Sequence, residues 1–170
     1  GITYIEGEAK FIDKKIIEVN GTQMTADNII IATGSHARLL PFIPAFNTPE
    51  GEALKNKVLT STELLDIDHV PQTMAIICAG VIGLELASAF ETFGSKVTVI
   101  EFLKECLPSI DSDIAKRLRK TLEKRGINFN MNSGVKSIVA TEDKKQAIVT
   151  FEQKGQEKKV IADIVLVATG

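Results

Sequence analysis

The chain has 170 residues, of which 44% are hydrophobic and 25% charged, and its formal net charge is −2. This length is enough for one medium domain, or for one domain with part of another attached. The charge excludes a broadly basic surface for nucleic acid or anionic membranes, and no apolar run reaches the roughly 18 residues of a membrane span. Because no signal peptide is recognisable, we expect a cytoplasmic protein that has neither nucleic acid nor membrane as a partner.

Residues 1–38 contain several runs of β-forming residues. Short runs at 3–6 and 15–19, with a strong Asn-Gly turn signal at 20–21, predict strands of a β meander. The segment 28–33 reads Asn-Ile-Ile-Ile-Ala-Thr and is almost entirely apolar. That composition predicts a strand buried on both faces of a sheet.

Residues 39–69 have a different character. Several prolines and Gly51 interrupt residues 39–58, and no helix or strand period is sustained there. We therefore predict a linker over 39–69 that contains one short helix at about 61–65.

A β-α-β pattern starts near position 73. An apolar strand is expected over 74–78, a helix over 81–93 and a second strand over 96–101, with Gly94 at the end of the helix. A second helix is predicted over 111–125, because acids lie in its first turn and basic residues in its last. The strands expected after it are 127–131, a meander of 135–140, 146–152 and 158–161, and a final buried strand over 164–169.

The sequence contains an internal repeat. Residues 26–34 read ADNIIIATG and residues 162–170 read ADIVLVATG. In each copy a strand that begins with Gly-Ile leads through a β meander to this block. The repeat indicates two related dinucleotide-binding folds in one parent protein, with the tail of the first and nearly all of the second in this chain.

Residues 76–87, IICAGVIGLELA, nearly match the glycine fingerprint of a dinucleotide-binding loop. Gly80 and Gly83 stand where the fingerprint needs close phosphate approach and close helix packing. Cys78 replaces the glycine of the tight turn. If that position requires a positive φ, the cysteine costs about 1–2 kcal/mol, so we expect weakened rather than abolished binding. The alternative is a loop that has only a structural role.

Glu101 ends the strand that follows this loop and helix. A carboxylate at that position can accept hydrogen bonds from the adenosine ribose, and it would repel the 2′-phosphate of NADP. A glutamate at a strand end is often only a solvated cap. Together with the loop, it predicts an NAD(H) site. The two cysteines, Cys78 and Cys106, lie too far apart for a zinc site or a C-x-x-C pair, so we expect reduced thiols and no metal site.

The chain resembles the pyridine nucleotide–disulfide oxidoreductases, and among them the dihydrolipoamide dehydrogenases. The stretches that carry the resemblance are 60–71, 79–102 and 107–127 together with both ATG blocks, so the resemblance covers essentially the whole chain. It implies an α/β fold: a Rossmann-like, three-layer β/β/α nucleotide-binding domain at about 70–170 with a parallel sheet and a β meander. Residues 1–38 would be a β segment from the tail of an FAD-binding domain.

The resemblance also implies roles for matching residues. Glu101 would bind the adenosine ribose, Ile82 and Glu85 would face the nicotinamide, Val135 would border the adenine, and Gly170 would close the site. The loop that would hold the NAD pyrophosphate consists of Cys78, Ala79, Gly80, Val81, Ile82 and Gly83. The residues that would contact FAD in the intact parent are Ala9, Thr33 and Gly34.

The parent implied by this resemblance passes electrons from dihydrolipoamide through a disulfide and FAD to NAD⁺. It would be a homodimer with FAD-binding and dimerisation domains, and it could be part of a 2-oxoacid dehydrogenase complex. The redox C-x-x-x-x-C pair and the C-terminal His-Glu pair of the family do not occur in residues 1–170. We therefore assign no catalytic residue here and expect no catalysis by this chain alone.

Two alternatives stay open. The parent could be another family member, such as a soluble transhydrogenase, an NADH oxidase or a mercuric-reductase relative, since their NAD domains would have similar patterns. The chain could also be a stand-alone NAD(H)-binding module that senses the nucleotide without reacting. The apolar stretches at both ends, without an initiator methionine, favour a piece of a longer protein over such a module.

Overall fold

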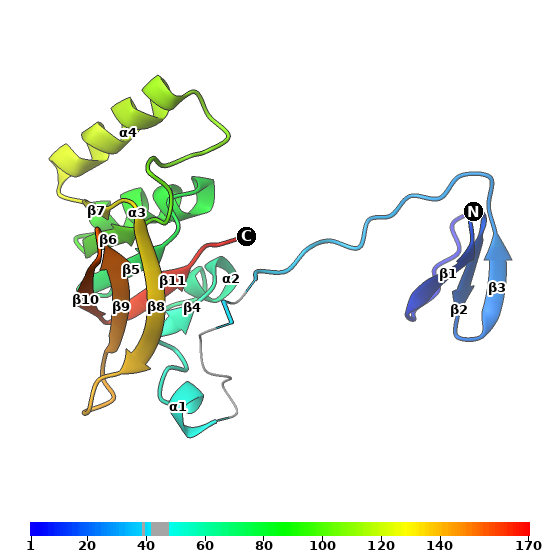
Figure 1. The fold of residues 1–170 in the computed structure, drawn as a ribbon. Helices are drawn as coiled ribbons and strands as arrows, with labels where there is room; N and C mark the ends of the chain where they lie inside the picture. Colours follow the sequence, from blue (N-terminus) through cyan, green and yellow to red (C-terminus); the bar gives the residue numbers. More distant parts are fainter. Residues whose placement is uncertain (39, 42–47) are drawn as a thin grey trace. The chain divides into compact units, whose positions relative to one another are not determined.

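A computed structural model of the chain describes residues 1–38, 40–41 and 48–170 (Figure 1). These residues form two compact units, Gly1–His36 and Ala37–Gly170. The first unit contains a small antiparallel sheet. The second contains a five-stranded parallel sheet, a second antiparallel sheet and every helix of the described residues.

The sheet of the first unit is a three-stranded meander. Its strands are β1 (Ala9–Asp13), β2 (Ile16–Val19) and β3 (Thr22–Thr25), which pair in the order β1-β2-β3. Asn20 and Gly21 connect β2 to β3 with φ values of 51° and 77°. Positive φ at both central residues is what a type I′ turn requires, so the predicted turn is confirmed.

Two strand predictions in this unit are wrong. Residues 3–6 and 28–33 form no strand, and the side chains of Ile30 and Ile31 are 89% and 68% exposed. A buried strand needs neighbours that pair with its N–H and C=O groups, and no described strand pairs with 28–33. The equivalent residues of the second copy have such neighbours, because β11 (Ile164–Val167) lies between β4 (Val58–Leu59) and β5 (Thr73–Ile77).

The parallel sheet forms the centre of the second unit. Its strand order is β4-β11-β5-β6-β7, and every neighbouring pair is parallel. All four residues of β11 and most of β5 are buried, as their apolar sequences predict. The remaining strands and their bounds are β4 (Val58–Leu59), β5 (Thr73–Ile77), β6 (Lys96–Ile100) and β7 (Asn128–Asn130).

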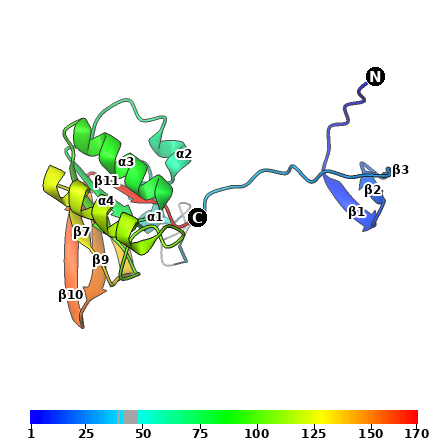
Figure 2. The ribbon, with the colours of Figure 1, turned by 90° about the horizontal axis from the view of Figure 1, so that it is seen from above.

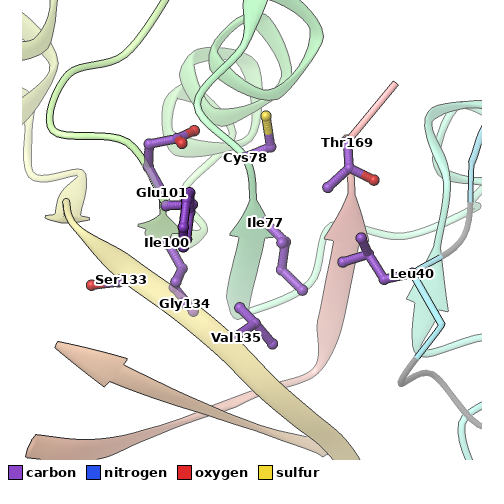
Figure 3. Close-up of a pocket in the computed structure, with 10 residues that line it drawn as sticks. Leu40, Ile77, Cys78, Ile100, Glu101, Ser133, Gly134, Val135 and Thr169 are labelled. Carbon is purple, nitrogen blue, oxygen red and sulfur yellow. The ribbon is translucent and has the colours of Figure 1, made fainter. Parts of the chain in front are cut away.

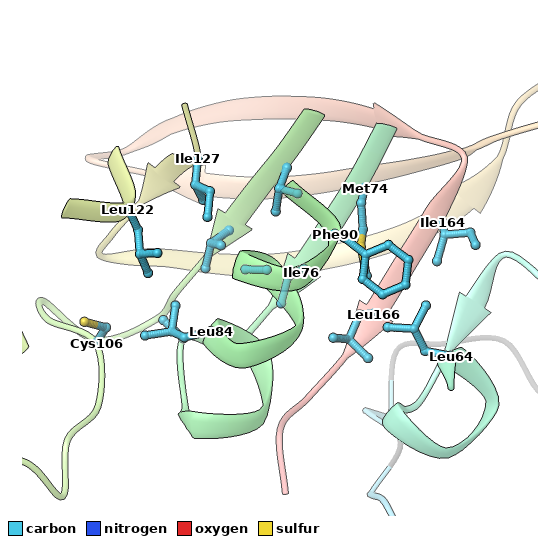
Figure 4. Packing of buried hydrophobic residues seen from close by; sticks show 14 of the residues in the cluster. Leu64, Met74, Ile76, Leu84, Phe90, Cys106, Leu122, Ile127, Ile164 and Leu166 are labelled. Carbon is cyan, nitrogen blue, oxygen red and sulfur yellow. The ribbon is translucent and has the colours of Figure 1, made fainter. Parts of the chain in front are cut away.

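Helices cover one face of this sheet and a meander covers the other (Figure 2). Side chains alternate between the faces, so Met74 and Ile76 pack with the helices while Ala75 and Ile77 pack with the meander. Figure 4 shows the helix side of this core. The covering elements are α3 (Val81–Thr92), α4 (Ser112–Arg125), β8 (Ser133–Ala140), β9 (Ala147–Gln153) and β10 (Gln156–Ala162). The predicted three-layer, Rossmann-like fold is confirmed.

The ends of the two long helices follow the sequence signals. Asp111 caps α4 by accepting from the N–H groups of Asp113 and Ile114, and Gly126 ends it with φ 111°. Gly94 follows α3 with φ 104°. Left-handed residues of this kind commonly end helices, so both predicted helix ends are confirmed.

The described part of the predicted linker is folded. It contains α1 (Pro49–Glu52), β4 and α2 (Ser61–Leu64), while residues 39 and 42–47 lie outside the described residues. Leu54 is fully buried on the meander side of the core, and the Lys57 carbonyl accepts from Val165 N–H at 2.6 Å. Pairing with β11 thus converts a segment without a sustained local pattern into an edge strand.

Asp163 ties the start of β5 to the end of the meander. One carboxylate oxygen accepts from the backbone N–H and the hydroxyl of Thr73, both at 2.8 Å, and the other accepts from the Gln146 amide at 2.9 Å. Burial alone would raise the pKa of Asp163, but the hydrogen bonds from Gln146 and Thr73 hold that pKa below its ordinary value of 3.8. The carboxylate is therefore ionised, and it stabilises the fold at neutral pH.

We predict that Asp163→Asn lowers the free energy of unfolding by about 1–3 kcal/mol at pH 7, because one acceptor becomes a donor that faces Thr73. Since the folded-state pKa lies below the unfolded one, the contribution of Asp163 is complete above about pH 4 and is lost as the pH falls through the folded pKa. Urea unfolding of wild type and Asp163→Asn at pH 7 and pH 3 measures this contribution to the free energy of unfolding. Asp143→Asn, at an exposed turn, is the control. Equal stability of Asp163→Asn and wild type at pH 7 would contradict the role of Asp163.

Candidate functional site

The chain turns from β5 into α3 within three residues. Ile77 ends β5, and Gly80 is the N-cap of α3 with φ −75°. Cys78 lies between them with φ 85°, a conformation that costs a non-glycine residue about 1–2 kcal/mol. The prediction that Cys78 belongs to the strand is therefore wrong by one residue. Cys78 occupies a position that requires a positive φ.

The two glycines of the loop have different surroundings. A Cβ on Gly83 would lie 2.3 Å from the carbonyl oxygen of Cys78, which no rearrangement of a side chain could relieve. A Cβ on Gly80 would contact only the Cys78 sulfur, at 3.7 Å. Gly83 thus allows α3 to pack against the loop, and Gly80 leaves open space where a ligand could approach the backbone.

The N-terminus of α3 is suited to an anion. No described side chain caps this helix, and its first turn contains no acidic residue. In contrast, α4 begins with the carboxylate of Asp111. The first N–H groups of a helix and its dipole favour a negative charge, so a phosphate could take the place of a cap at α3.

Glu101 follows β6 directly, and its side chain is 4% exposed. One carboxylate oxygen accepts from Ala79 N–H at 2.6 Å, and the other accepts from Leu103 N–H at 2.7 Å. Each oxygen has a further lone pair that could accept from a ligand hydroxyl. Glu101 therefore holds the glycine loop in place and still has acceptor capacity.

Cys78 of the glycine loop and Glu101 line a cavity of about 310 Å³ at the carboxyl ends of β5, β6 and β11 (Figure 3). Three predicted site residues line it: Cys78, Glu101 and Val135. The sequence analysis assigned no role to the others, although Ile77 lies in the fingerprint stretch and Thr169 in the second ATG block. These residues are Leu40, Ile77, Ile100, Phe102, Ser133, Gly134 and Thr169.

The other predicted contacts do not line the cavity, and they include the loop residues Ala79, Gly80, Val81 and Gly83. Ile82 and Glu85 are exposed on α3 and do not line this cavity; Glu85 lines a separate groove between α3 and α4. Gly170 follows Thr169 of the cavity wall, and its carbonyl accepts from Arg38 N–H at 2.8 Å. The residues of the first unit for which FAD contacts are predicted, all exposed, are Ala9, Thr33 and Gly34.

Both cysteines are free thiols. Burial raises the pKa of the Cys78 thiol, and the nearby Glu101 carboxylate raises it further against the effect of the Gly80 N–H. Burial also raises the pKa of Cys106, to about 11. Both thiols are therefore protonated at neutral pH. Within residues 1–38, 40–41 and 48–170, no group of three or more His, Cys, Asp or Glu side chains could hold a metal ion.

The described helices include none with the length and apolar character to cross a membrane. A buried strand, a tight glycine loop, an uncapped helix N-terminus and an acid after the next strand are features of the Rossmann-type nucleotide-binding fold. A family model described as pyridine nucleotide-disulphide oxidoreductase matches residues 1–170. The chain belongs to this family.

Its relatives include enzymes with different names. The chain is 36% identical to a dihydrolipoamide dehydrogenase of Chaetomium thermophilum, with 100% of this chain and 33% of the relative covered. It is 35% identical to a mercuric reductase of Staphylococcus aureus, with 100% and 29% covered. A solved structure of the HOCl-induced flavoprotein disulfide reductase RclA from Escherichia coli is 32% identical, with a TM-score of 0.74 and coverage of 98% and 35%. The chain thus spans about a third of each relative.

We predict different outcomes for alanine at the two glycines. Gly83→Ala should lower the free energy of unfolding by about 1–3 kcal/mol or more, because its methyl group overlaps the Cys78 carbonyl. Gly80→Ala should fold almost as well as wild type, yet bind NADH at least about tenfold more weakly, because its methyl group occupies the phosphate approach. Thermal melts and NADH titrations measure both variants. Unchanged NADH affinity of Gly80→Ala would show that no phosphate approaches there.

We also predict that Cys78→Gly improves NADH affinity up to about tenfold, because glycine adopts φ 85° without strain and leaves the loop amides in place. Cys78→Ala is the matched control: it removes the thiol and keeps the strained Cβ, so it should not bring the gain. Calorimetric titration of the three proteins measures the affinities. If Cys78→Gly binds no better than wild type, the loop accommodates cysteine without loss.

Proposed function

We propose that the Ala37–Gly170 unit binds a pyridine dinucleotide, NAD(H) in preference to NADP(H), in the cavity between the glycine loop and Glu101. One observation carries the proposal: Cys78 of the glycine loop and the buried carboxylate of Glu101 line one cavity, and the open backbone at Gly80 and the uncapped N-terminus of α3 follow Cys78 within three residues. Family membership supports the same ligand class.

The shape of the site fits such a ligand. The space beside Gly80 admits a phosphate to the backbone, and the α3 amides can donate to its oxygens. Glu101, which lines the cavity, can accept from ribose hydroxyls. The apolar walls formed by Leu40, Phe102 and Val135 suit a flat aromatic base. When bound, the nicotinamide ring of such a nucleotide accepts or releases a hydride.

Glu101 determines the choice between the two nucleotides. Its carboxylate is buried and held by Ala79 and Leu103, so it cannot swing away from an incoming 2′-phosphate. Like charges at this range in a partly desolvated pocket repel strongly. A 2′-hydroxyl, in contrast, can donate to the carboxylate. The expected preference is therefore for NAD(H).

We further propose that the parent protein is a flavin-dependent dithiol:NAD⁺ oxidoreductase similar to the dihydrolipoamide dehydrogenases. In it, Ala9, Thr33 and Gly34 contact FAD, and Ile82 with Glu85 face the nicotinamide. Glu85 is exposed on α3, where a neighbouring domain could cover it. The parent acts as a homodimer. A mercuric-reductase-like parent is the second candidate, because identity to that relative is nearly the same.

We predict that the 170-residue chain binds NADH at least about tenfold more tightly than NADPH, a difference of about 1.4 kcal/mol. Fluorescence titration with each nucleotide measures the ratio. Reduced nicotinamide mononucleotide, which lacks the adenosine half, is the control and should bind far more weakly than NADH. Equal affinities for NADH and NADPH would remove Glu101 from the role of ribose ligand, and no binding of either would overturn the proposed function.

A further inference from the structure

Ala79 of the glycine loop is held from outside its own strand through both its N–H and its carbonyl group. Ala79 is fully buried, and its N–H donates to Glu101. Its carbonyl oxygen accepts from Leu107 N–H at 3.0 Å. The residue between Cys78 and Gly80 is thus fixed on both sides, and the second contact comes from the segment 102–110 rather than from the sheet.

Leu107 is held in an unusual conformation. It is a bulky residue with φ 50°, and it is 8% exposed in the core beside α3. Such residues keep a left-handed conformation only where the surroundings impose it. The neighbouring Cys106 is also buried, close to Leu84 (Figure 4), and its thiol donates to the Ala115 carbonyl of α4 at 3.5 Å.

A bidentate ion pair anchors the segment 102–110 to α4. Arg119 Nε and Nη2 donate to the two carboxylate oxygens of Glu105, at 2.7 Å and 3.0 Å. The side chains are 21% and 15% exposed, so the pair is well shielded from water. Glu105 Oε1 also accepts from Cys106 N–H at 3.1 Å. Bidentate, shielded pairs of this kind are stronger and more rigid than ordinary surface pairs.

The ionisation of Glu105 agrees with this geometry. The Arg119 guanidinium lowers the pKa of Glu105 to about 2, against a raising effect of burial. Glu105 is therefore a carboxylate throughout the physiological pH range. Hydrogen bonds thus link α4 to Glu105 and Glu105 to Cys106 N–H, and the peptide chain links Cys106 to Leu107, whose N–H contacts Ala79.

We propose that the Arg119–Glu105 pair positions the dinucleotide-binding loop: it fixes residues 105–107 so that Leu107 N–H holds the Ala79 carbonyl. Arg119 and Glu105 are positioning residues that touch no ligand themselves. This inference rests on the proposed function, because its consequence is measured as nucleotide affinity. Loss of the pair releases Leu107 from its left-handed conformation and loosens the loop at Cys78 and Gly80.

The experiment compares two arginines of the same helix in the 170-residue chain. Arg119→Gln removes the pair with Glu105. Arg125→Gln is the matched control, because Arg125 joins α4 to Glu91, Ser88 and Thr92 of α3 and has no hydrogen bond to residues 105–107. NADH titrations are made well below the melting temperature of each variant. Arg119→Gln should raise the Kd for NADH at least about threefold, within the range for remote coupled residues, and Arg125→Gln should leave it unchanged.

Two further measurements separate positioning from a general loss of stability. Arg119→Lys keeps the charge with a single contact and should restore part of the affinity. Amide hydrogen exchange of Leu107 should be faster in Arg119→Gln than in Arg125→Gln, while the amides of β5 and β6 stay protected. Equal Kd values for Arg119→Gln and wild type, or equal rises for Arg119→Gln and Arg125→Gln, would overturn the inference alone. Absence of NADH binding by wild type would overturn the proposed function first, and the inference with it.

Discussion

The structure of the site depends on the buried carboxylate of Glu101. A buried carboxyl group needs hydrogen bonds, and Glu101 receives them from Ala79 and Leu103 N–H at 2.6 Å and 2.7 Å. These two donors belong to the glycine loop and to the segment after β6. One side chain therefore joins the two βα connections that border the cavity. The residue expected to recognise the ribose is also the residue that shapes the site.

The strained residues follow from this constraint. Ala79 is held by Glu101 and Leu107, and α3 packs so closely that Gly83 has no room for a Cβ. The chain between β5 and Gly80 must then turn within two residues, which requires the positive φ of Cys78. A glycine would meet this requirement without strain. Cysteine adopts this positive φ because the contacts around the loop stabilise the conformation by more than the strain of Cys78 costs.

Local signals were sufficient for the β5–α3–β6 unit and for both ends of α4, because caps, glycines and apolar runs act over a few residues. Local signals were insufficient where contacts with residues distant in the sequence determine the structure. The runs 28–33 and 164–167 lie at matching places in the repeated block and are both rich in apolar residues, but among the described residues only the second has neighbouring strands. The described residues of the predicted linker are ordered because they pair with β11 and pack on the core. No local sequence pattern predicts these distant contacts.

The site was predictable to a similar degree. The fingerprint identified Gly80 and Gly83, and the strand end identified Glu101. The contacts of Phe102, Gly134 and Leu40 with the cavity depend on how three layers meet, so no spacing in the sequence marks them. The same holds for the bond between Leu107 and Ala79, which joins residues far apart in the chain.

The central claim is that this cavity holds a pyridine dinucleotide against the N-terminus of α3. The most direct measurement is an amide NMR titration of the ¹⁵N-labelled chain with NADH. The account predicts saturable shifts at the amides of residues 79–83, at Glu101 and at Gly134, with little change in α1 and in β10. Shifts confined to residues away from the cavity, or no saturable shift at millimolar NADH, would contradict it.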